Sequence, residues 1–138
     1  MTLTPTLLAP EDLADRRPVW AALSSMFLDA DVTLTRTWRV EVLARSPYPT
    51  QVLEQILTEE VYPVCWGNLN SGRPVVSSFD AAWLEATILQ QGASPQMYAH
   101  LLSLARMAVP HSTEWQATRD AVAALRGEPA TTGVPPHH

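Results

Sequence analysis

The chain has 138 residues, of which 46% are hydrophobic and 17% are charged, and its formal net charge is −5. This length and composition fit one globular domain and exclude a disordered chain. Acidic side chains outnumber basic ones by 14 to 9, so the basic footprint that neutralises nucleic-acid phosphates is missing. We therefore expect no nucleic-acid partner.

Cysteine content and apolar runs indicate the expected compartment. The single cysteine, Cys65, allows no disulfide within the chain and no cysteine-based zinc cluster. The first ten residues lack the basic and apolar regions of a secretory signal, and no apolar run reaches the ~18 residues of a membrane span. The expected localisation is cytoplasmic, with no membrane contact.

Prolines divide the chain into short segments with helical periodicity. Residues 1–9 are expected to form a loose lead-in, and a first helical turn is expected to open near Pro10. Pro18 either kinks that turn or starts a new helix, because proline is favoured in a first turn. The apolar stripe that follows consists of Val19, Trp20, Leu23, Met26 and Phe27.

The next two predicted helices are separated by a proline-rich turn. A second helix is expected from about Thr35 to Arg45, with Trp38 and Val42 on its apolar face and Trp38 in the core. Residues 46–49, Ser-Pro-Tyr-Pro, should end it, because a residue before proline disfavours the helical conformation. The third helix has the clearest amphipathic pattern, formed by Leu53, Ile56, Leu57 and Val61.

A break in periodicity follows the third helix. Pro63 interrupts its apolar pattern, and residues 64–69 are expected to form either a further helical turn or an irregular packed segment. Residues 70–74 are typical of an exposed loop, and Val75-Val76 is the only place for a short strand.

Three further helices are expected to complete the domain. Ser78 and Gly92 are suited to cap one helix over residues 79–91, and Ser94-Pro95 opens the next, which Pro110 ends. Either Ser112 or Thr113, the latter in a capping box with Gln116, caps the last helix, and Gly127 closes it. The expected inward faces are Met97, Tyr98, Leu101, Leu104, Ala105 and Ala108, then Trp115, Val122 and Leu125.

These patterns predict an all-α fold. We expect a single compact domain of roughly five to seven short, proline-punctuated helices over residues 1–127. Residues 128–138 are expected to form a flexible tail. His137-His138 at its end is also typical of the start of a purification tag.

Few residues are of the types that carry chemistry, and we expect no catalytic site, no cofactor and no metal ion. The internal histidines, His100 and His111, lack further ligands at metal-site spacing. Cys65 lies in an apolar stretch, which favours a buried thiol over a nucleophile.

The adjacent carboxylates Glu59 and Glu60 are not placed as an acid–base pair, because neighbouring helical residues face different directions. We expect one of them to face inward and to bond the backbone groups that Pro63 leaves free. Solvent exposure and catalysis are the alternatives.

The tryptophans supply the candidate partner-binding residues. Four of them, Trp20, Trp38, Trp83 and Trp115, lie on stripes predicted for the core. Trp66 instead follows the break at Pro63, in a segment that concentrates aromatic and polar side chains. Recognition often uses such segments and depends on aromatic anchors. The candidate partner-binding residues are therefore Tyr62, Trp66 and Asn68, with core packing of Trp66 as the alternative.

Three segments together carry a resemblance to a known family. The first is Arg17-Pro18-Val19-Trp20 leading into Ala22-Leu23-Ser24 and Phe27-Leu28-Asp29, and the second is Ser46-Pro47-Tyr48 followed by Leu53-Glu54-Gln55-Ile56-Leu57. The third is Glu60-Val61-Tyr62-Pro63-Val64-Cys65 with Asn68-Leu69. Over residues 16–90 this series resembles an uncharacterised family of short bacterial proteins, and the resemblance implies no activity and no catalytic residues.

We expect a protein–protein interaction module that is not an enzyme and whose partner is another protein. The favoured form is a cytosolic immunity protein that neutralises a bacterial toxin domain, since an acidic inhibitor associates rapidly with a basic toxin. The alternative is a non-catalytic regulatory or structural subunit of another bacterial complex. A small enzyme with a site assembled from residues such as Glu59, Glu60 and Cys65 is a third hypothesis.

Overall fold

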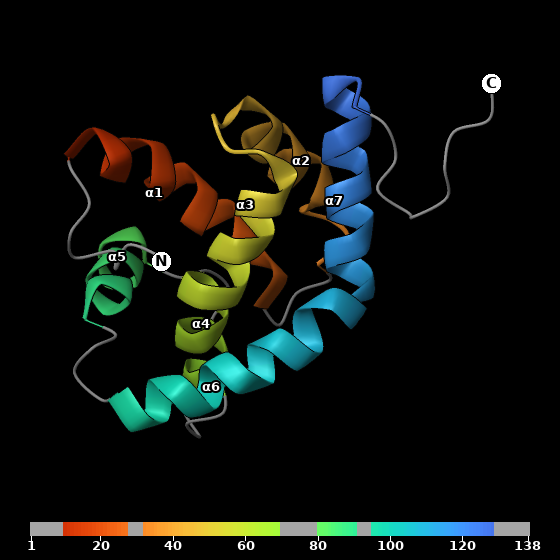
Figure 1. Cartoon of the computed structure of the whole chain (residues 1–138). Helices are drawn as coiled ribbons and strands as arrows, with labels where there is room; N and C mark the ends of the chain where they lie inside the picture. Colours follow the sequence, from red (N-terminus) through yellow and green to blue (C-terminus); the bar gives the residue numbers. More distant parts are fainter. Residues whose placement is uncertain (1–9, 28–31, 70–79, 91–94, 129–138) are drawn as a thin grey trace.

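The computed structural model describes residues 10–27, 32–69, 80–90 and 95–128, with the backbone alone for residues 10–11 and 67–69. Helical segments account for the regular structure in these ranges, which contain no strand, so the predicted all-α fold is confirmed (Figure 1). The α-helices are α1 (Pro10–Ser24), α2 (Arg36–Arg45), α3 (Thr50–Ile56), α4 (Tyr62–Leu69), α5 (Ala81–Leu89), α6 (Pro95–Ala108) and α7 (Thr113–Arg126). Two 3₁₀ turns, η2 (Ser25–Phe27) and η5 (Val109–His111), and one π-helical turn, η3 (Leu57–Val61), join them.

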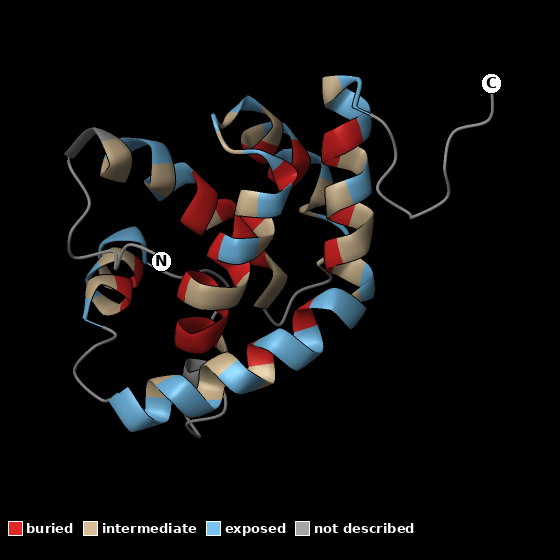
Figure 2. Cartoon of the chain, in the orientation of Figure 1, coloured by how far each residue is buried: buried red, intermediate tan, exposed pale blue. Residues whose placement is uncertain are grey.

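The middle of the molecule is a nearly continuous helix made of α3, η3 and α4, here called the central helix (Thr50–Leu69). α1 packs against η3, α7 packs against α3, and α6 crosses below η3 and α4. α2 lies beside α7 and α1. Buried residues concentrate along the central helix and on the faces that the neighbouring helices turn toward it (Figure 2). The central helix therefore organises the core.

The first and third predicted apolar stripes are confirmed. Val19, Trp20 and Leu23 of α1 are fully buried, and Met26 and Phe27 pack against the core from η2. Leu53, Ile56, Leu57 and Val61 of the central helix are all buried. Burying a leucine-sized side chain contributes roughly 1.5–3 kcal/mol, so this inward face holds a large share of the stabilising apolar contact.

Pro18 lies inside α1 and does not start a new helix, so one of the two alternatives is wrong. A proline removes the hydrogen bond to the carbonyl four residues earlier, which here belongs to Ala14. Both Ala14 and Pro18 are exposed, so water can bond that carbonyl. The helix continues because the missing bond lies on its solvent side.

Of the two alternatives for residues 64–69, the further helical turn is confirmed, because the central helix runs through Pro63 as π-turn η3 followed by α4. The Tyr62 N–H donates to the Leu57 carbonyl, five residues back. Pro63 has no N–H for the Glu59 carbonyl, but the Tyr98 hydroxyl of α6 donates to that carbonyl at 2.9 Å. A side chain from another helix thus replaces the bond that proline removes, which no local pattern could indicate.

The buried face of α2 differs from the predicted one. Arg39, Val40 and Leu43 point into the core, whereas Trp38 is 48% exposed. The expectation of Trp38 in the core is therefore wrong. Arginine is rarely fully buried unless it is paired, so the sequence pattern indicated that the face containing Arg39 points to solvent.

The later helices were predicted correctly in type, with errors at caps and faces. Asp80 caps α5, accepting a hydrogen bond from the Trp83 N–H at 2.8 Å, and Ser112 caps α7 through the Trp115 N–H at 3.1 Å. The alternative capping box is wrong, because the Gln116 side chain donates to the Pro110 carbonyl. Three residues expected to face inward are instead exposed: Met97, Ala108 and Leu125.

The C-terminal end of α7 matches the expectation. Gly127 has a φ of +74°, the left-handed conformation in which glycine closes a helix. Arg126 donates to the carbonyls of Leu43, Ala44 and Ser46 and so joins this end to the end of α2. The expectations for residues 1–9, for Ser78, Gly92 and Ser94, for the loop and strand over 70–76 and for the tail from 129 onward lie outside the described residues.

Leu57→Ala is expected to lower the free energy of unfolding by about 2–5 kcal/mol, because Leu57 is only 2% exposed and the change leaves a cavity in the core. Thermal or urea unfolding measures the loss. Leu125→Ala is the matched control, since Leu125 is 60% exposed and should change stability little. Equal effects of the two substitutions would contradict the observed face of the central helix.

Tyr98→Phe is expected to lower the free energy of unfolding by about 1–3 kcal/mol, because it leaves the Glu59 carbonyl without the bond that replaces a helical N–H. Urea unfolding provides the measurement. Tyr48→Phe removes a hydroxyl whose contact with the Arg16 guanidinium is 3.4 Å long, and a smaller effect is expected there. A Tyr98→Phe protein as stable as wild type would show that the hydroxyl is not needed at this carbonyl.

Candidate functional site

Two of the predicted partner-binding residues belong to one group of aromatic rings, here called the aromatic cluster (Phe27, Tyr62 and Trp66). The Phe27 ring meets the Tyr62 ring edge-on, with centroids 5.6 Å apart and planes at 81°. Tyr62 in turn stacks on Trp66, with centroids 6.4 Å apart and planes at 22°. These geometries are preferred for aromatic pairs and fix each ring relative to the next.

The segment that holds this cluster is helical, which is one of the two alternatives expected for it. Tyr62 and Trp66 are four residues apart on α4, a spacing that places side chains on one helix face. Tyr62 is 8% exposed, and Phe27 and Trp66 are partly buried against the core. Asn68 follows on the same helix, but its side chain lies outside the described residues. Partner binding by these residues stays a prediction.

Glu60 faces inward, as expected for one of the two adjacent carboxylates, and is 4% exposed. It accepts a hydrogen bond from the Trp20 indole at 2.7 Å and two from the Arg16 guanidinium at 3.2 and 3.3 Å. These bonds join the central helix to α1. The expected bond to the backbone groups near Pro63 stays a prediction. Removing either donor would leave a buried carboxylate with fewer bonds, so the group is a structural junction.

A second junction of the same chemistry lies at the other side of the central helix. The Trp115 indole of α7 donates to Glu54 at 2.7 Å, and Arg119 lies 3.3 Å from the same carboxylate oxygen. Trp115 is fully buried. Sequence reasoning predicted both tryptophans in the core but missed their carboxylate partners, which lie 40 and 61 residues away along the chain.

The candidates for nucleophilic and metal chemistry are separated in the structure. Cys65 is fully buried, and burial raises the pKa of its thiol far above the usual range, which disfavours the nucleophilic thiolate. His100 and His111 are both exposed, on α6 and in η5. Within the described ranges, no three histidine, cysteine or acidic residues are grouped to hold a metal ion.

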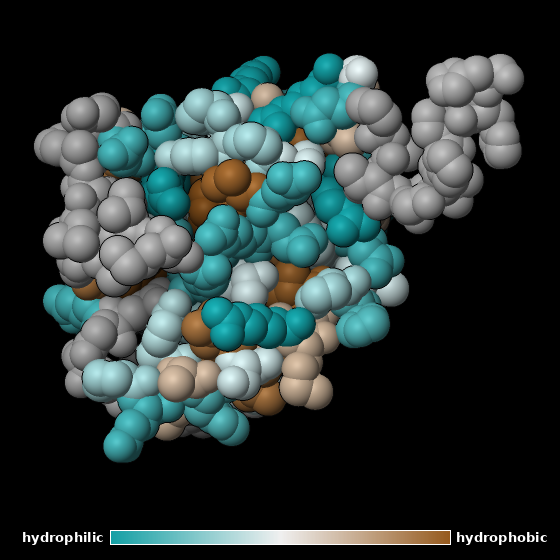
Figure 3. Space-filling model, viewed as in Figure 1, coloured by the Kyte–Doolittle hydropathy of each residue, from teal (hydrophilic) through white to brown (hydrophobic). Residues whose placement is uncertain are grey.

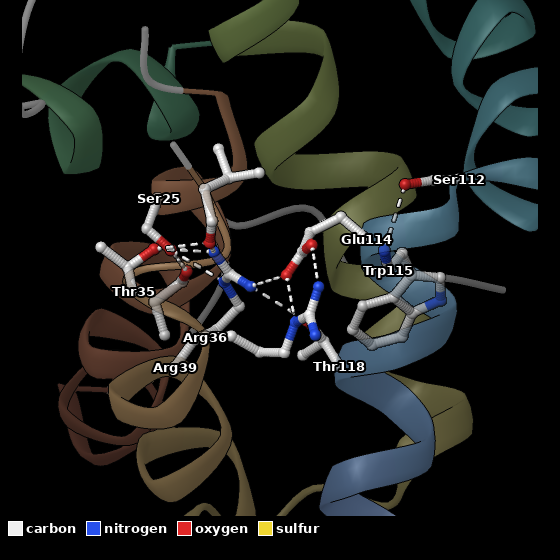
Figure 4. Close-up of polar contacts among 10 residues, drawn as sticks. Ser25, Thr35, Arg36, Arg39, Ser112, Glu114, Trp115 and Thr118 are labelled. Atoms are coloured by element: carbon white, nitrogen blue, oxygen red, sulfur yellow. Dashed lines mark hydrogen bonds and ion pairs between the residues drawn. The ribbon is translucent and has the colours of Figure 1, made fainter. Parts of the chain in front are cut away.

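The most extensive polar group is centred on a buried arginine that sequence reasoning missed. Arg39 of α2 donates to Ser25, to Glu114 and Thr118 of α7, and to the Val32 carbonyl and the Thr35 hydroxyl (Figure 4). These distances range from 2.6 to 3.1 Å. Arg36 adds a bidentate pair to Glu114 at 2.7 and 2.8 Å. The group joins η2, α2 and α7. In the sequence, the apolar residues Val40 and Leu43 could have indicated that the face of α2 that carries Arg39 points into the core.

The electrostatics of this group are those of a satisfied structural ion pair. Hydrogen bonds from Arg36 and Arg39 hold the pKa of the Glu114 carboxyl below its usual value, although burial opposes them. Burial lowers the pKa of Arg39, while its bonds to Glu114 act in the opposite direction. The arrangement joins the charges of Arg36, Arg39 and Glu114 in one hydrogen-bonded group.

A pocket of about 280 Å³ opens between α1 and α5. It is lined by Arg17, Trp20, Ala21, Ala81, Ala82, Leu84 and Glu85. Its lining is mostly apolar, and its two charged groups, Arg17 and Glu85, form an ion pair with each other. This composition offers shape and apolar contact but no acid–base or nucleophilic pair.

The face of the molecule drawn in Figure 3 is mostly hydrophilic, with apolar side chains in small separate spots. Across the described residues, no helix combines the length and apolar character needed to span a membrane. The large apolar side chains that are exposed are Leu34, Trp38, Met97, Met107 and Leu125.

Fold and site together define an all-α protein whose buried charges serve as structural junctions. The chain belongs to a family described as a domain of unknown function (DUF7079), whose model matches residues 14–121. This span reaches from the middle of α1 into α7 and includes the central helix and all three junction carboxylates, Glu54, Glu60 and Glu114. Searches of curated proteins and of solved structures found no match.

The Glu114 group predicts acid-sensitive stability. A carboxyl whose pKa is lowered in the folded state contributes stability that is present above its unfolded pKa of about 4.3 and is lost as the pH falls through the lowered value. Wild-type protein should therefore lose stability in this acidic range, and Glu114→Gln should be less stable at neutral pH but lose less on acidification. Urea unfolding at a series of pH values measures both. Glu85→Gln controls for the change in net charge, and a Glu114→Gln curve parallel to wild type would contradict the assignment.

Proposed function

We propose that this protein is a protein–protein interaction module that binds its partner through the aromatic cluster. The observation that carries the proposal is the state of Trp66, a partly exposed ring stacked on Tyr62 and anchored on a helix of the core. Tryptophan and tyrosine dominate the energetics of protein interfaces. A ring already fixed in position loses little conformational entropy on binding, which favours affinity.

The arrangement around Trp66 supports a rigid anchor. Tyr62 is almost fully buried and cannot move without disturbing the core, and Phe27 holds it edge-on from η2. The helix beneath is fixed at η3 by the Tyr98 hydroxyl. Trp66 therefore keeps one orientation in the free protein, as expected of a surface prepared for a partner.

The partner class we propose is a basic toxin domain, which would make the protein a cytosolic immunity protein of bacterial origin. The formal net charge of −5 supports this, because opposite charge on the partner accelerates association. A non-catalytic subunit of another bacterial complex is the alternative, and the identity of the captured partner separates the two.

Affinity capture with the full chain from its native host, followed by titration of the purified partner, tests the proposal. Trp66→Ala is expected to weaken binding by about 30-fold or more, as for an anchor residue at an interface. Trp66→Phe, which retains a ring, should weaken it less. Since Trp66 also packs against the core, binding is measured at a temperature where each variant is fully folded.

Leu125→Ala is the control, because it removes an exposed apolar side chain from α7, which carries no residue of the aromatic cluster. It is expected to retain wild-type affinity for the partner. A partner whose affinity is unchanged by Trp66→Ala, or is lowered equally by Leu125→Ala, would contradict binding through the aromatic cluster.

A further inference from the structure

The outer face of α2 carries a second exposed aromatic group that the proposed function does not use. Leu34 lies in the turn before α2 and is 80% exposed, and Trp38 is 48% exposed. Glu41 and Arg45 are also exposed. Trp38, Glu41 and Arg45, three and four residues apart, form one stripe along α2, and Leu34 precedes Trp38 by four residues in the turn before the helix. These four residues are here called the outer stripe (Leu34, Trp38, Glu41 and Arg45).

The opposite face of α2 is fixed in place. Arg39, Val40 and Leu43 are buried, and the Arg39 bonds to α7 and η2 hold the helix in one rotation about its axis. The outer stripe is therefore displayed rigidly. Such spacing is that of a seam between two packed helices.

The stripe is complementary to itself. The spacing between its four residues is the same from the first to the last as from the last to the first. When a second copy of α2 packs antiparallel, Trp38 therefore lies opposite the partner copy's Glu41. In the same arrangement Leu34 lies opposite the partner copy's Arg45. One twofold axis between positions 39 and 40 generates both pairs twice, as an isologous interface requires. The two helix dipoles then also run in opposite directions.

Both pairings are chemically favourable. An indole N–H opposite a carboxylate is the arrangement that this chain uses twice in its core, at 2.7 Å for Trp20 with Glu60 and for Trp115 with Glu54. The aliphatic stem of an arginine can cover an exposed leucine while its guanidinium stays in water. The donor Trp38 and the acceptor Glu41 lie on the same face, so a second copy supplies each with its complement.

We propose that the outer stripe of α2 is a homodimer interface and that its occupant is a second copy of this chain, packed antiparallel. This inference does not depend on binding through the aromatic cluster, which lies on η2 and α4. A seam of four residues on each side is small, so the dimer should dissociate on dilution in the micromolar range.

Sedimentation equilibrium of the full-length chain over a concentration series tests the proposal. Wild type is expected to show a reversible monomer–dimer equilibrium. Trp38→Ala should raise the dimer dissociation constant by about 30-fold or more, and Glu41→Arg should also raise it, because it replaces the acceptor with a cation. Leu125→Ala and Met107→Ala remove exposed apolar side chains from α7 and α6 and should leave it unchanged. The melting temperature of each variant confirms that it is folded.

Disulfide trapping tests the register. A Leu34→Cys chain mixed with an Arg45→Cys chain is expected to form the mixed disulfide in preference to either homodimer, while the buried Cys65 stays unreactive. A wild-type protein that is monomeric throughout the series would overturn the proposal. A dimer that survives Trp38→Ala, or that traps 34 with 34 or 45 with 45 in preference to the mixed pair, would do so too.

Discussion

A buried tryptophan needs an acceptor for its indole N–H, and this requirement governs how the helices are assembled. Glu54 and Glu60 of the central helix meet it for Trp115 of α7 and Trp20 of α1, each at 2.7 Å. Arg119 and Arg16 then balance the charge of these carboxylates. Glu60 is 4% exposed and would be costly to bury without its donors, so it fixes α1 against the central helix. The Glu54 side chain is 33% exposed and adds a bond to α7.

The sequence predicted those parts of the fold that depend on local periodicity and caps. The stripes of α1 and the central helix and the closure of α7 at Gly127 follow from rules that act within a few residues. The errors have a common cause, which is contact with residues that lie far away along the chain. Pro63 was expected to interrupt the helical pattern, but the helix continues, and the Tyr98 hydroxyl donates to the Glu59 carbonyl that proline leaves without an N–H. The face of α2 was misassigned because Arg39 is buried with Glu114, 75 residues away.

The candidate site was predictable to a lesser extent. Composition and the position of Pro63 singled out Tyr62 and Trp66, and the structure brings them together, but as neighbours on a helix and not in a loop. Phe27 joins them from 35 residues upstream, beyond the reach of a local pattern. The sequence did not predict that Trp38 is exposed, because a tryptophan on a helical stripe is most often buried.

The π-turn in the central helix bears on how members of this family compare with one another. A bond from Tyr62 to Leu57 spans five residues where an α-helix spans four, so the turn holds one residue more than a regular helix needs. Loss of a single residue between Leu57 and Val61 would restore the regular helix, because the Tyr62 N–H would still bond to the Leu57 carbonyl, now four residues back, and α4 would keep its orientation. Val64 and Cys65 would then stay in the core, whereas residues inside the turn would shift, among them Glu60 beside Trp20. A one-residue gap at this point in an alignment would therefore mark a relative whose α4 packs in the same way but whose junction between the central helix and α1 is altered.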